Sequence, residues 1–280
     1  MLGFAKTETH LPRFASCAPE MKSFLFLLVV PLLAQPGVSL YTLEKERALG
    51  QQCASEIRRQ SKPIANPLID AYVKRVGGEL VAQLKDVPFD YQFEVISDGT
   101  WTEPFSLPGG YVFIPARAFV AAQDEAEFVG MLAHSIGHVA LRHGTRSQIV
   151  NMASIPLVFT GGWTGPHADS ERPQTLVPVS FLEFQSTHEL EADRFGLQPA
   201  ARTGYETAAF QRYLERTHSA DSKMSPLPPR ELRLARLQET VSSFPLSMPS
   251  PSGEEFRRVQ QTVRSIIERP EQHGVPTLKR

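Results

Sequence analysis

Two histidines stand four positions apart near the middle of the chain. The segment reads His134-Ser135-Ile136-Gly137-His138. If this segment is helical, both imidazoles lie on one face, a turn apart, and can reach a single metal ion. Zinc binds histidine nitrogen at about 2.0–2.1 Å, and its catalytic sites use three protein ligands and a water. The spacing alone is weak evidence, because histidines on helices are often core or capping residues.

Two carboxylates with the same spacing follow later in the chain. Glu189 and Asp193 are also four positions apart, within the segment ELEAD at 189–193. One carboxylate can complete a three-ligand metal site, while the other accepts the remaining N–H of a ligating histidine. The alternative is an acidic helix face in contact with water. The spacing by itself leaves both interpretations open.

Apolar periodicity predicts the elements that come before the histidine pair. We expect helices at 42–60 and 68–84 and strands at 91–95 and 111–114. A turn at 107–110, which contains Pro108, Gly109 and Gly110, leads directly into the second strand. The segment before the histidines is therefore predicted to be a pair of helices followed by a small sheet.

A helix with clear end signals is predicted to hold the two histidines. Asp124 offers an N-cap, and Glu127 three residues later completes a capping-box pattern. The helix should run to about His143, where Gly144 supplies a C-terminal stop. A loop rich in Gly and Pro at 160–175 comes next, and further helices are expected at 180–198, 206–217, 230–241 and 254–268. This order predicts an α+β fold.

Three segments together resemble peptidase family M48, which includes the HtpX-type and CAAX-prenyl-type zinc proteases and soluble periplasmic members. They read LPGGYVFIP at 107–115, DEAEFVGMLAHSIGHVALRH at 124–143 and HELEADRFG at 188–196. The resemblance runs from about Leu43 to Leu237. It implies a mostly helical zincin fold of the gluzincin class, with a small antiparallel sheet next to the helix that bears the two histidines.

The resemblance also implies roles for individual residues. His134, His138 and Glu189 match the ligands of one Zn²⁺ per chain, and Asp193 matches the partner of a ligating histidine. The segment Gly110, Tyr111, Val112 and Phe113 matches the active-site edge strand, which holds an extended peptide by strand addition. An extended or misfolded polypeptide is therefore the expected partner.

The chain departs from the family pattern around the catalytic centre. Ser135 stands where the family has the glutamate that deprotonates the zinc-bound water, and a hydroxyl is a poor base near neutral pH. Leu227 stands at the position of a histidine that helps to stabilise the transition state. Ser186 replaces an arginine, and the segment 103–105 reads Glu-Pro-Phe in place of Asn-Ala-Phe. The segment 233–237, RLARL, keeps the family's Arg-x-x-Arg-Leu pattern. We therefore expect retained metal with weak or lost hydrolysis.

Three further polar residues lie near the predicted metal site in the sequence. Glu183 and Glu191 are the obvious carboxylates near the ligand helix that could replace the missing base. His143 is interpreted as a helix-end residue whose positive charge would favour the helix dipole, rather than as a ligand.

The N-terminal region predicts export. Phe24 to Leu33 form an apolar run behind Lys22 that is shorter than the roughly 20 residues needed to span a bilayer. Small residues follow, up to Ser39, which is the pattern of a signal peptide. We expect a secreted, periplasmic or cell-envelope protein without a transmembrane span after cleavage. An uncleaved anchor or a buried strand is the alternative, and Met21 is a second candidate start.

Composition fits an ordinary globular protein. The 280 residues are 41% hydrophobic and 21% charged with a net charge of −1, so nothing suggests nucleic-acid binding. Cys17 and Cys53 define no disulfide framework. We divide the chain into an N-terminal extension with signal peptide (1–39), a metallopeptidase-like domain (40–244) and a Pro-rich linker with a helical tail (245–280).

Three functions fit these features. The first is a weakened metalloendopeptidase. The second is a non-catalytic, zinc-bound domain that grips extended or misfolded polypeptide as a holdase or assembly factor. The third is a purely structural zinc fold within an envelope complex. Ser135 and Leu227 favour the second over the first, and the oligomeric state is left open.

Overall fold

The computed structural model describes five stretches of the chain, all within the compact unit Ser39–Arg280. They are residues 41–97, 101–146, 179–218, 227–244 and 253–268. In the helix that begins at Val179, side chains are described from residue 186 onward. The expected signal peptide, the loop at 160–175 and the side chain of Glu183 lie outside the described residues.

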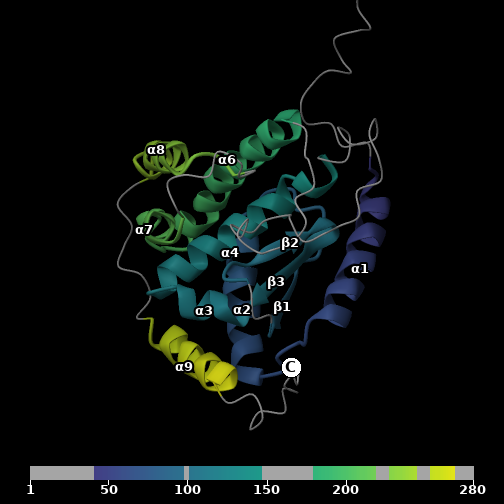
Figure 1. The fold of residues 1–280 in the computed structure, drawn as a ribbon, viewed down its shortest axis with the longest axis vertical. Coiled ribbons are helices and arrows are strands. Elements are labelled where there is room, and N and C mark those ends of the chain that lie inside the picture. Colours follow the sequence, from purple (N-terminus) through teal and green to yellow (C-terminus); the bar gives the residue numbers. More distant parts are fainter. Residues whose placement is uncertain (1–40, 98–100, 147–178, 219–226, 245–252, 269–280) are drawn as a thin grey trace, which may run out of the picture. The chain divides into compact units, whose positions relative to one another are not determined.

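Helices make up most of the described chain, and three short strands form one sheet (Figure 1). The helices are α1 (Leu43–Gln60), α2 (Pro67–Val81), α3 (Ala116–Ala121), α4 (Glu125–Ala140), α6 (Val179–Arg202), α7 (Ala208–Thr217), α8 (Arg230–Val241) and α9 (Glu254–Glu268). The strands are β1 (Gln92–Ile96), β2 (Phe105–Leu107) and β3 (Tyr111–Pro115). This confirms the predicted α+β class. Strand β2 and helix α3 have no counterpart among the expected elements, because both are too short to show a period.

The sheet is mixed, which corrects the expected antiparallel sheet. The strand order is β1-β3-β2, with β1 parallel and β2 antiparallel to β3. A tight turn, η2 (Pro108–Gly110), folds β2 back onto β3. Gly110 has φ 103°, and a Cβ there would lie 2.4 Å from the carbonyl oxygen of Asp90, so the turn requires glycine.

The strand order also corrects the interpretation of Tyr111, Val112 and Phe113. These residues lie on β3, the middle strand, where each is paired with both β1 and β2. A strand with two partners has no free edge at which a peptide can add. In the described part of the chain, the strand edge beside α4 belongs to β2.

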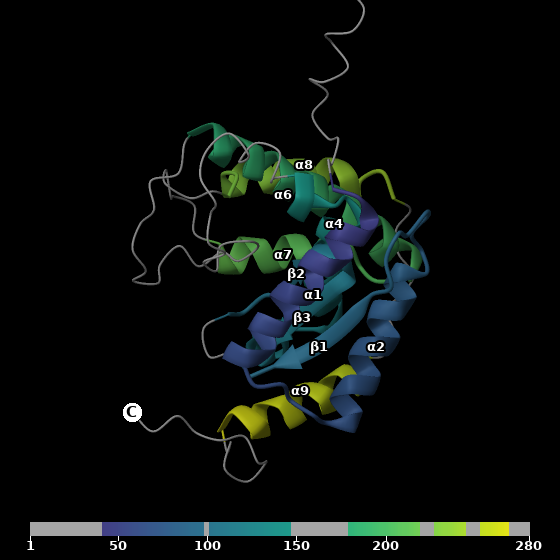
Figure 2. The ribbon, with the colours of Figure 1, turned by 90° about the vertical axis from the view of Figure 1, so that its right-hand side faces the viewer.

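Both faces of the sheet are covered, which follows from the alternation of side chains along β3. Tyr111 and Phe113 point to one face and pack with Ala54 of α1. Val112 and Ile114 point to the other face, into the core built with α2, α3 and α4. Figures 1 and 2 show α1 along one side of the sheet and α4 along the other.

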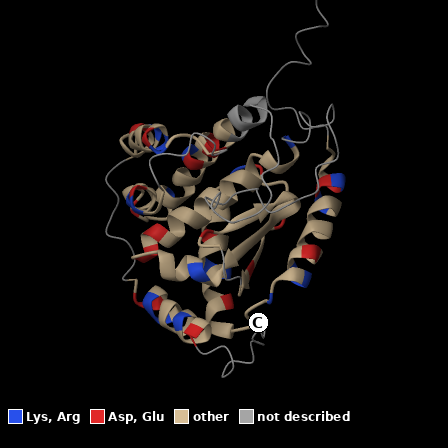
Figure 3. Cartoon of the chain, viewed as in Figure 1, with Lys and Arg blue, Asp and Glu red and all other residues tan. Residues whose placement is uncertain are grey.

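Helix α9 belongs to the same core. Phe256, Val259, Val263 and Ile266 are buried in it. The remaining surface of α9 is polar, and acidic and basic residues are interspersed along α1, α8 and α9 (Figure 3). The helical tail expected after residue 245 is thus packed against the rest of the fold.

Helix α4 begins as predicted but ends earlier. The Asp124 carboxylate accepts a hydrogen bond of 2.8 Å from the N–H of Glu127. The Glu127 carboxylate accepts from Gln123, one residue before the position that a capping box uses. At the other end, Arg142 takes a left-handed backbone conformation with φ 56°, so the helix stops at Ala140. Gly144 lies in a further helical turn at 143–146 and is not the stop.

Two glycines let α4 and α6 approach closely. A Cβ on Gly196 would lie 2.6 Å from the carbonyl oxygen of Ala133, and a Cβ on Gly137 would lie 3.0 Å from that of Ala192. Larger residues would separate the two helices. This close packing brings the histidines of α4 next to the carboxylates of α6.

Candidate metal centre

Three side chains from α4 and α6 converge in the protein interior. The Nε2 atoms of His134 and His138 lie 3.1 Å apart. Glu189 places one carboxylate oxygen 3.3 Å from the first nitrogen and the other 3.4 Å from the second. Each residue is only 6% exposed. The predicted ligands therefore lie together and aim their donor atoms at one point.

The spacing of these donor atoms suits zinc. A tetrahedral zinc ion with ligand distances of about 2.0–2.1 Å holds its ligand atoms about 3.3–3.4 Å apart. Two imidazole nitrogens and one carboxylate are a donor set of catalytic zinc sites, which leave a fourth position for water. Within the described residues, this is the group of His, Cys, Asp or Glu side chains whose donor atoms come close enough to hold a metal.

Asp193 and Arg233 support His134 from behind. The Nδ1 atom of His134 lies 2.8 Å from Asp193 Oδ1, although its N–H points off the line to that oxygen. The same carboxylate accepts two hydrogen bonds from Arg233, at 2.8 and 2.7 Å. All three side chains are buried. Arg233 lies in the RLARL segment, so its presence was visible in the sequence, but its contact with Asp193 was not.

The electrostatics of this buried cluster favour a cation. Burial raises the pKa of Glu189, but His138, His134 and Arg233 outweigh burial and bring it well below its usual value. Burial also lowers the pKa of His134, yet Asp193 and Glu189 outweigh it and raise that pKa to about 9. Two carboxylates with lowered pKa values thus face two imidazoles in a buried site, which is a favourable environment for a divalent cation.

His138 is backed by a second histidine. His143 Nδ1 lies 3.0 Å from His138 Nδ1, and His143 Nε2 lies 3.1 Å from Glu191. Burial, followed by the charges of His188 and Arg146, lowers the pKa of His143 to about 2. His143 lies beyond the end of α4 and outside the group of candidate ligands, and its contact with His138 is one that the helix-end interpretation did not include.

Glu191 lies on the far side of His143 from the metal ligands. Its carboxylate contacts His143 and, at 3.0 Å, Arg146. These contacts do not support its use as a substitute base at the metal.

Ser135 lies in the centre of the fold and faces β2. Its side chain is fully buried, and its hydroxyl donates a hydrogen bond of 2.7 Å to the carbonyl oxygen of Pro104. Pro104 directly precedes β2. The position of the expected base is thus occupied by a short side chain that is bound to the backbone of its neighbour.

A largely buried pair of side chains lies next to this contact, with 11% of Glu103 and 8% of His218 exposed. Glu103 contacts His218, at the end of α7, with 3.1 Å between Oε1 and Nε2. Burial raises the pKa of Glu103, but the hydrogen bond and charge of His218, together with Arg233, bring it below its usual value. These residues are 115 positions apart, so sequence spacing could not have indicated their pairing. Leu227 is half-buried before α8, and its side chain has no group that can donate a hydrogen bond.

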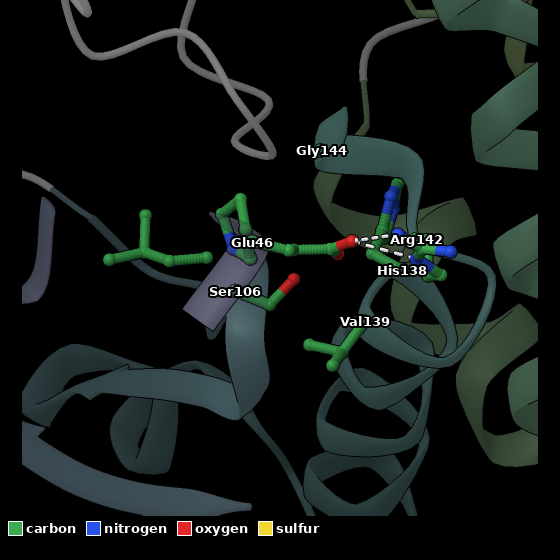
Figure 4. Close-up of a pocket in the computed structure, with 8 residues that line it drawn as sticks. Glu46, Ser106, His138, Val139, Arg142 and Gly144 are labelled. Carbon is green, nitrogen blue, oxygen red and sulfur yellow. Dashed lines mark hydrogen bonds and ion pairs between the residues drawn. The ribbon is translucent and has the colours of Figure 1, made fainter. Parts of the chain in front are cut away.

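A small cavity separates the end of α4 from β2 (Figure 4). Its volume is about 10 Å³, enough for one water, and it is lined by Ser106, His138, Arg142 and Glu46 among others. Glu46 of α1 is buried and accepts hydrogen bonds from Arg142 at 2.7 Å and Thr145 at 3.1 Å. Helix α1 is thereby attached to the turn that follows α4.

Comparison with known proteins agrees with this arrangement. The sequence model described as Peptidase family M48 matches residues 67–241. The chain is 25% identical over 221 residues to the beta-barrel assembly-enhancing protease of Escherichia coli (strain K12), covering 75% of this chain and 45% of that protein. It is 25% identical over 198 residues to the protein of that name from Yersinia pestis, covering 67% of this chain and 40% of the relative.

A eukaryotic relative is also similar. The mitochondrial metalloendopeptidase OMA1 of Schizosaccharomyces pombe is 24% identical over 227 residues, which cover 77% of this chain and 67% of that protein.

The chain spans less than half the length of the two bacterial relatives. Among the described residues, no helix is long and apolar enough to cross a membrane.

Proposed function

The chain belongs to peptidase family M48, and on that premise we propose that it is a zinc-binding metalloendopeptidase-family protein of the cell envelope whose hydrolysis is weak or lost. One observation carries this proposal. The donor atoms of His134, His138 and Glu189 lie 3.1–3.4 Å apart, as a zinc ion requires, while Ser135 occupies the place of the base.

This geometry suggests a role for each residue of the site. A bound zinc ion would acidify a water and polarise a peptide carbonyl. His134, His138 and Glu189 would hold the ion, and Asp193 would keep the ring of His134 in place. Position 135 supplies no proton acceptor, because the Ser135 hydroxyl is insufficiently basic and already donates to Pro104. Loss of a general base typically lowers a rate by about 10²–10⁴-fold.

A second group is also missing. At the position of the family's histidine, the Leu227 side chain cannot donate a hydrogen bond to the oxyanion of the transition state. One such donor is commonly worth about 10²–10³-fold in rate. The two losses together support a protein that binds its metal but turns over slowly.

Polypeptide binding would use β2 rather than β3. Strand β2 lies next to α4, and Ser106 lines the same cavity as the metal ligand His138. An extended chain that added to the outer edge of β2 would pass close to the metal centre. We therefore propose β2 as the substrate-side strand, in place of the segment Gly110–Phe113.

The second candidate is a non-catalytic, zinc-bound factor that binds unfolded polypeptide for assembly or quality control. It is favoured by the same substitutions at positions 135 and 227. Two bacterial relatives are named for enhancing beta-barrel assembly. Because the chain spans under half of those proteins, their activity as a whole carries over only as a proposal.

One experiment tests the proposed function. The purified chain is assayed for zinc by elemental analysis, for cleavage of unfolded casein, and for suppression of the aggregation of an unfolded protein. We expect about one zinc per chain and very slow cleavage. Suppression of aggregation that is lost when the zinc is removed would favour the second candidate. A stable protein with no zinc would contradict both.

A further inference from the structure

The two histidine ligands are supported in different ways. His134 is backed by Asp193, a partner that the family resemblance already implies. His138 is backed by His143, to which neither the resemblance nor its position at the end of a helix assigns such a role. Behind His138, three further side chains contact one another in turn: His143, Glu191 and Arg146.

The distances define this chain. His138 Nδ1 lies 3.0 Å from His143 Nδ1, and His143 Nε2 lies 3.1 Å from Glu191 Oε2. The same oxygen accepts a hydrogen bond of 3.0 Å from Arg146. His143 is 2% exposed, while the side chain of Glu191 is 39% exposed. The chain therefore runs from the buried ligand to the protein surface.

The chemistry of His138, His143 and Glu191 permits one direction of hydrogen bonding along the chain. An ionised carboxylate can only accept, so His143 must donate from Nε2 to Glu191. A neutral imidazole has a single N–H, so the Nδ1 atom of His143 is then an acceptor. The N–H on Nδ1 of His138, 3.0 Å away, is placed to satisfy it. This leaves the lone pair of His138 on Nε2, the atom that faces Glu189 and His134.

The ring of His143 is itself held in place. It stacks on His188 with ring centres 4.1 Å apart and planes 5° from parallel. It also lies in the helical turn that follows Arg142, whose side chain is bound by the buried carboxylate of Glu46. His143 therefore has little freedom to rotate away from His138.

We propose that Glu191 and His143 form a positioning relay that sets the tautomer and ring orientation of His138 for metal binding. The relay rests on the proposed metal site, and it makes metal affinity depend on two residues that do not touch the metal. Residues in this outer position typically contribute about 10–100-fold to metal affinity. His143 and Glu191 are thus positioning residues, not ligands or catalytic groups.

The test measures the zinc dissociation constant of the full chain by competition with a chromophoric chelator. His143→Phe keeps an aromatic ring against His188 but removes both nitrogens, and should raise the constant about 10–100-fold. Glu191→Gln keeps an acceptor without charge and should give a smaller increase. Glu206→Gln is the matched control, because Glu206 also pairs with an arginine but lies away from the site, and it should change nothing.

Two further measurements separate positioning from general damage to the fold. The double variant should bind zinc no more weakly than His143→Phe alone, because Glu191 acts through His143. The visible absorption of the cobalt-substituted protein should change in His143→Phe, since it reports the ligand geometry directly. Melting of the metal-free proteins shows which variants fold.

The outcomes distinguish the relay from the metal site. Wild type without zinc would contradict the proposed function itself. Wild type with zinc, together with unchanged affinity and cobalt spectrum in His143→Phe, would overturn the relay alone. If His143→Phe does not fold, the Glu191→Gln variant decides, because the Glu191 side chain is partly exposed and its substitution should be tolerated. Unchanged zinc affinity in Glu191→Gln would then overturn the relay, and weakened zinc affinity would support it.

Discussion

The hydroxyl of Ser135 donates a hydrogen bond of 2.7 Å to the carbonyl oxygen of Pro104. Both residues are buried, one on α4 and one just before β2. The position at which the family resemblance implies a base thus makes a structural contact in this chain, because Ser135 ties α4 to the segment that leads into β2.

Removing this contact should cost stability without affecting the metal. Ser135→Ala leaves the buried carbonyl of Pro104 without its donor, which should lower the free energy of unfolding by about 1–3 kcal/mol. Zinc content should stay the same. Ser55→Ala is the control, because the Ser55 hydroxyl bonds within the exposed face of α1, and it should change stability by less than about 0.5 kcal/mol. Urea denaturation measures both, and equal losses would refute the role given to Ser135.

The buried pair of Asp193 and Arg233 gives a second prediction. Arg233→Met leaves Asp193 buried without its partner, so the free energy of unfolding should fall by about 3–5 kcal/mol. Asp193 is then no longer held by Arg233, so it fixes the ring of His134 less firmly. Zinc should therefore bind about 10–100-fold more weakly.

Arg236→Met is the matched control on the same helix. Arg236 pairs with Glu239 at the surface, where its side chain is 59% exposed. An exposed pair of this kind contributes about 0–1 kcal/mol. A loss in Arg236→Met as large as that in Arg233→Met would contradict a special role for Arg233.

The Glu103–His218 pair predicts a dependence of stability on pH. The pKa of Glu103 in the folded protein lies below its ordinary value of 4.5, because His218 and Arg233 outweigh burial. Its ionised form therefore stabilises the fold fully above pH 4.5, and this stabilisation is lost as the pH falls through the lower, folded-state pKa. Glu103→Gln should be less stable than wild type at pH 7, and the difference should shrink below about pH 4.5. Denaturation at pH 7, 5, 4 and 3 tests this, and a difference that stays constant would contradict it.

The sequence was sufficient where local chemistry decides the outcome. The histidines of HSIGH face one point because a helix places positions four apart on one face, and the Asp124 cap begins that helix as its sequence predicts. Helices α8 and α9 begin and end at the predicted residues. In these segments short-range hydrogen bonding and apolar periodicity agree.

The sequence was insufficient where distant contacts decide. The end of α4 is set by the left-handed Arg142, which Glu46 binds from a helix 96 positions away. The parallel pairing of β1 with β3 depends on the route of the chain through β2, which is only three residues long. The roles of His143 and Glu103 likewise depend on partners that no local pattern indicates.

Export gives a prediction that rests on sequence alone. The run from Lys22 to Ser39 should be removed by cleavage between Ala34 and Leu40. Mass spectrometry of the N-terminus of protein taken from the cell-envelope fraction measures this. A cytoplasmic protein that still begins at Met1 or Met21 would show that the prediction is wrong.

The central claim is that the metal site is kept and the base is lost. Position 135 precedes His138 by three residues, so a longer carboxylate there lies on the same edge of the helix as the ligands. Ser135→Glu should therefore recover part of the roughly 10²–10⁴-fold effect of a general base. Leu227→His should add a further gain of up to about 10²–10³-fold in the double variant.

The most direct measurement is casein cleavage by four proteins at matched zinc content: wild type, Ser135→Glu, Leu227→His and the double variant. We predict very slow cleavage by wild type, a clear increase in Ser135→Glu, and the fastest cleavage by the double variant. Wild-type cleavage at the rate of an active relative measured beside it, or no increase in Ser135→Glu despite bound zinc, would contradict the claim.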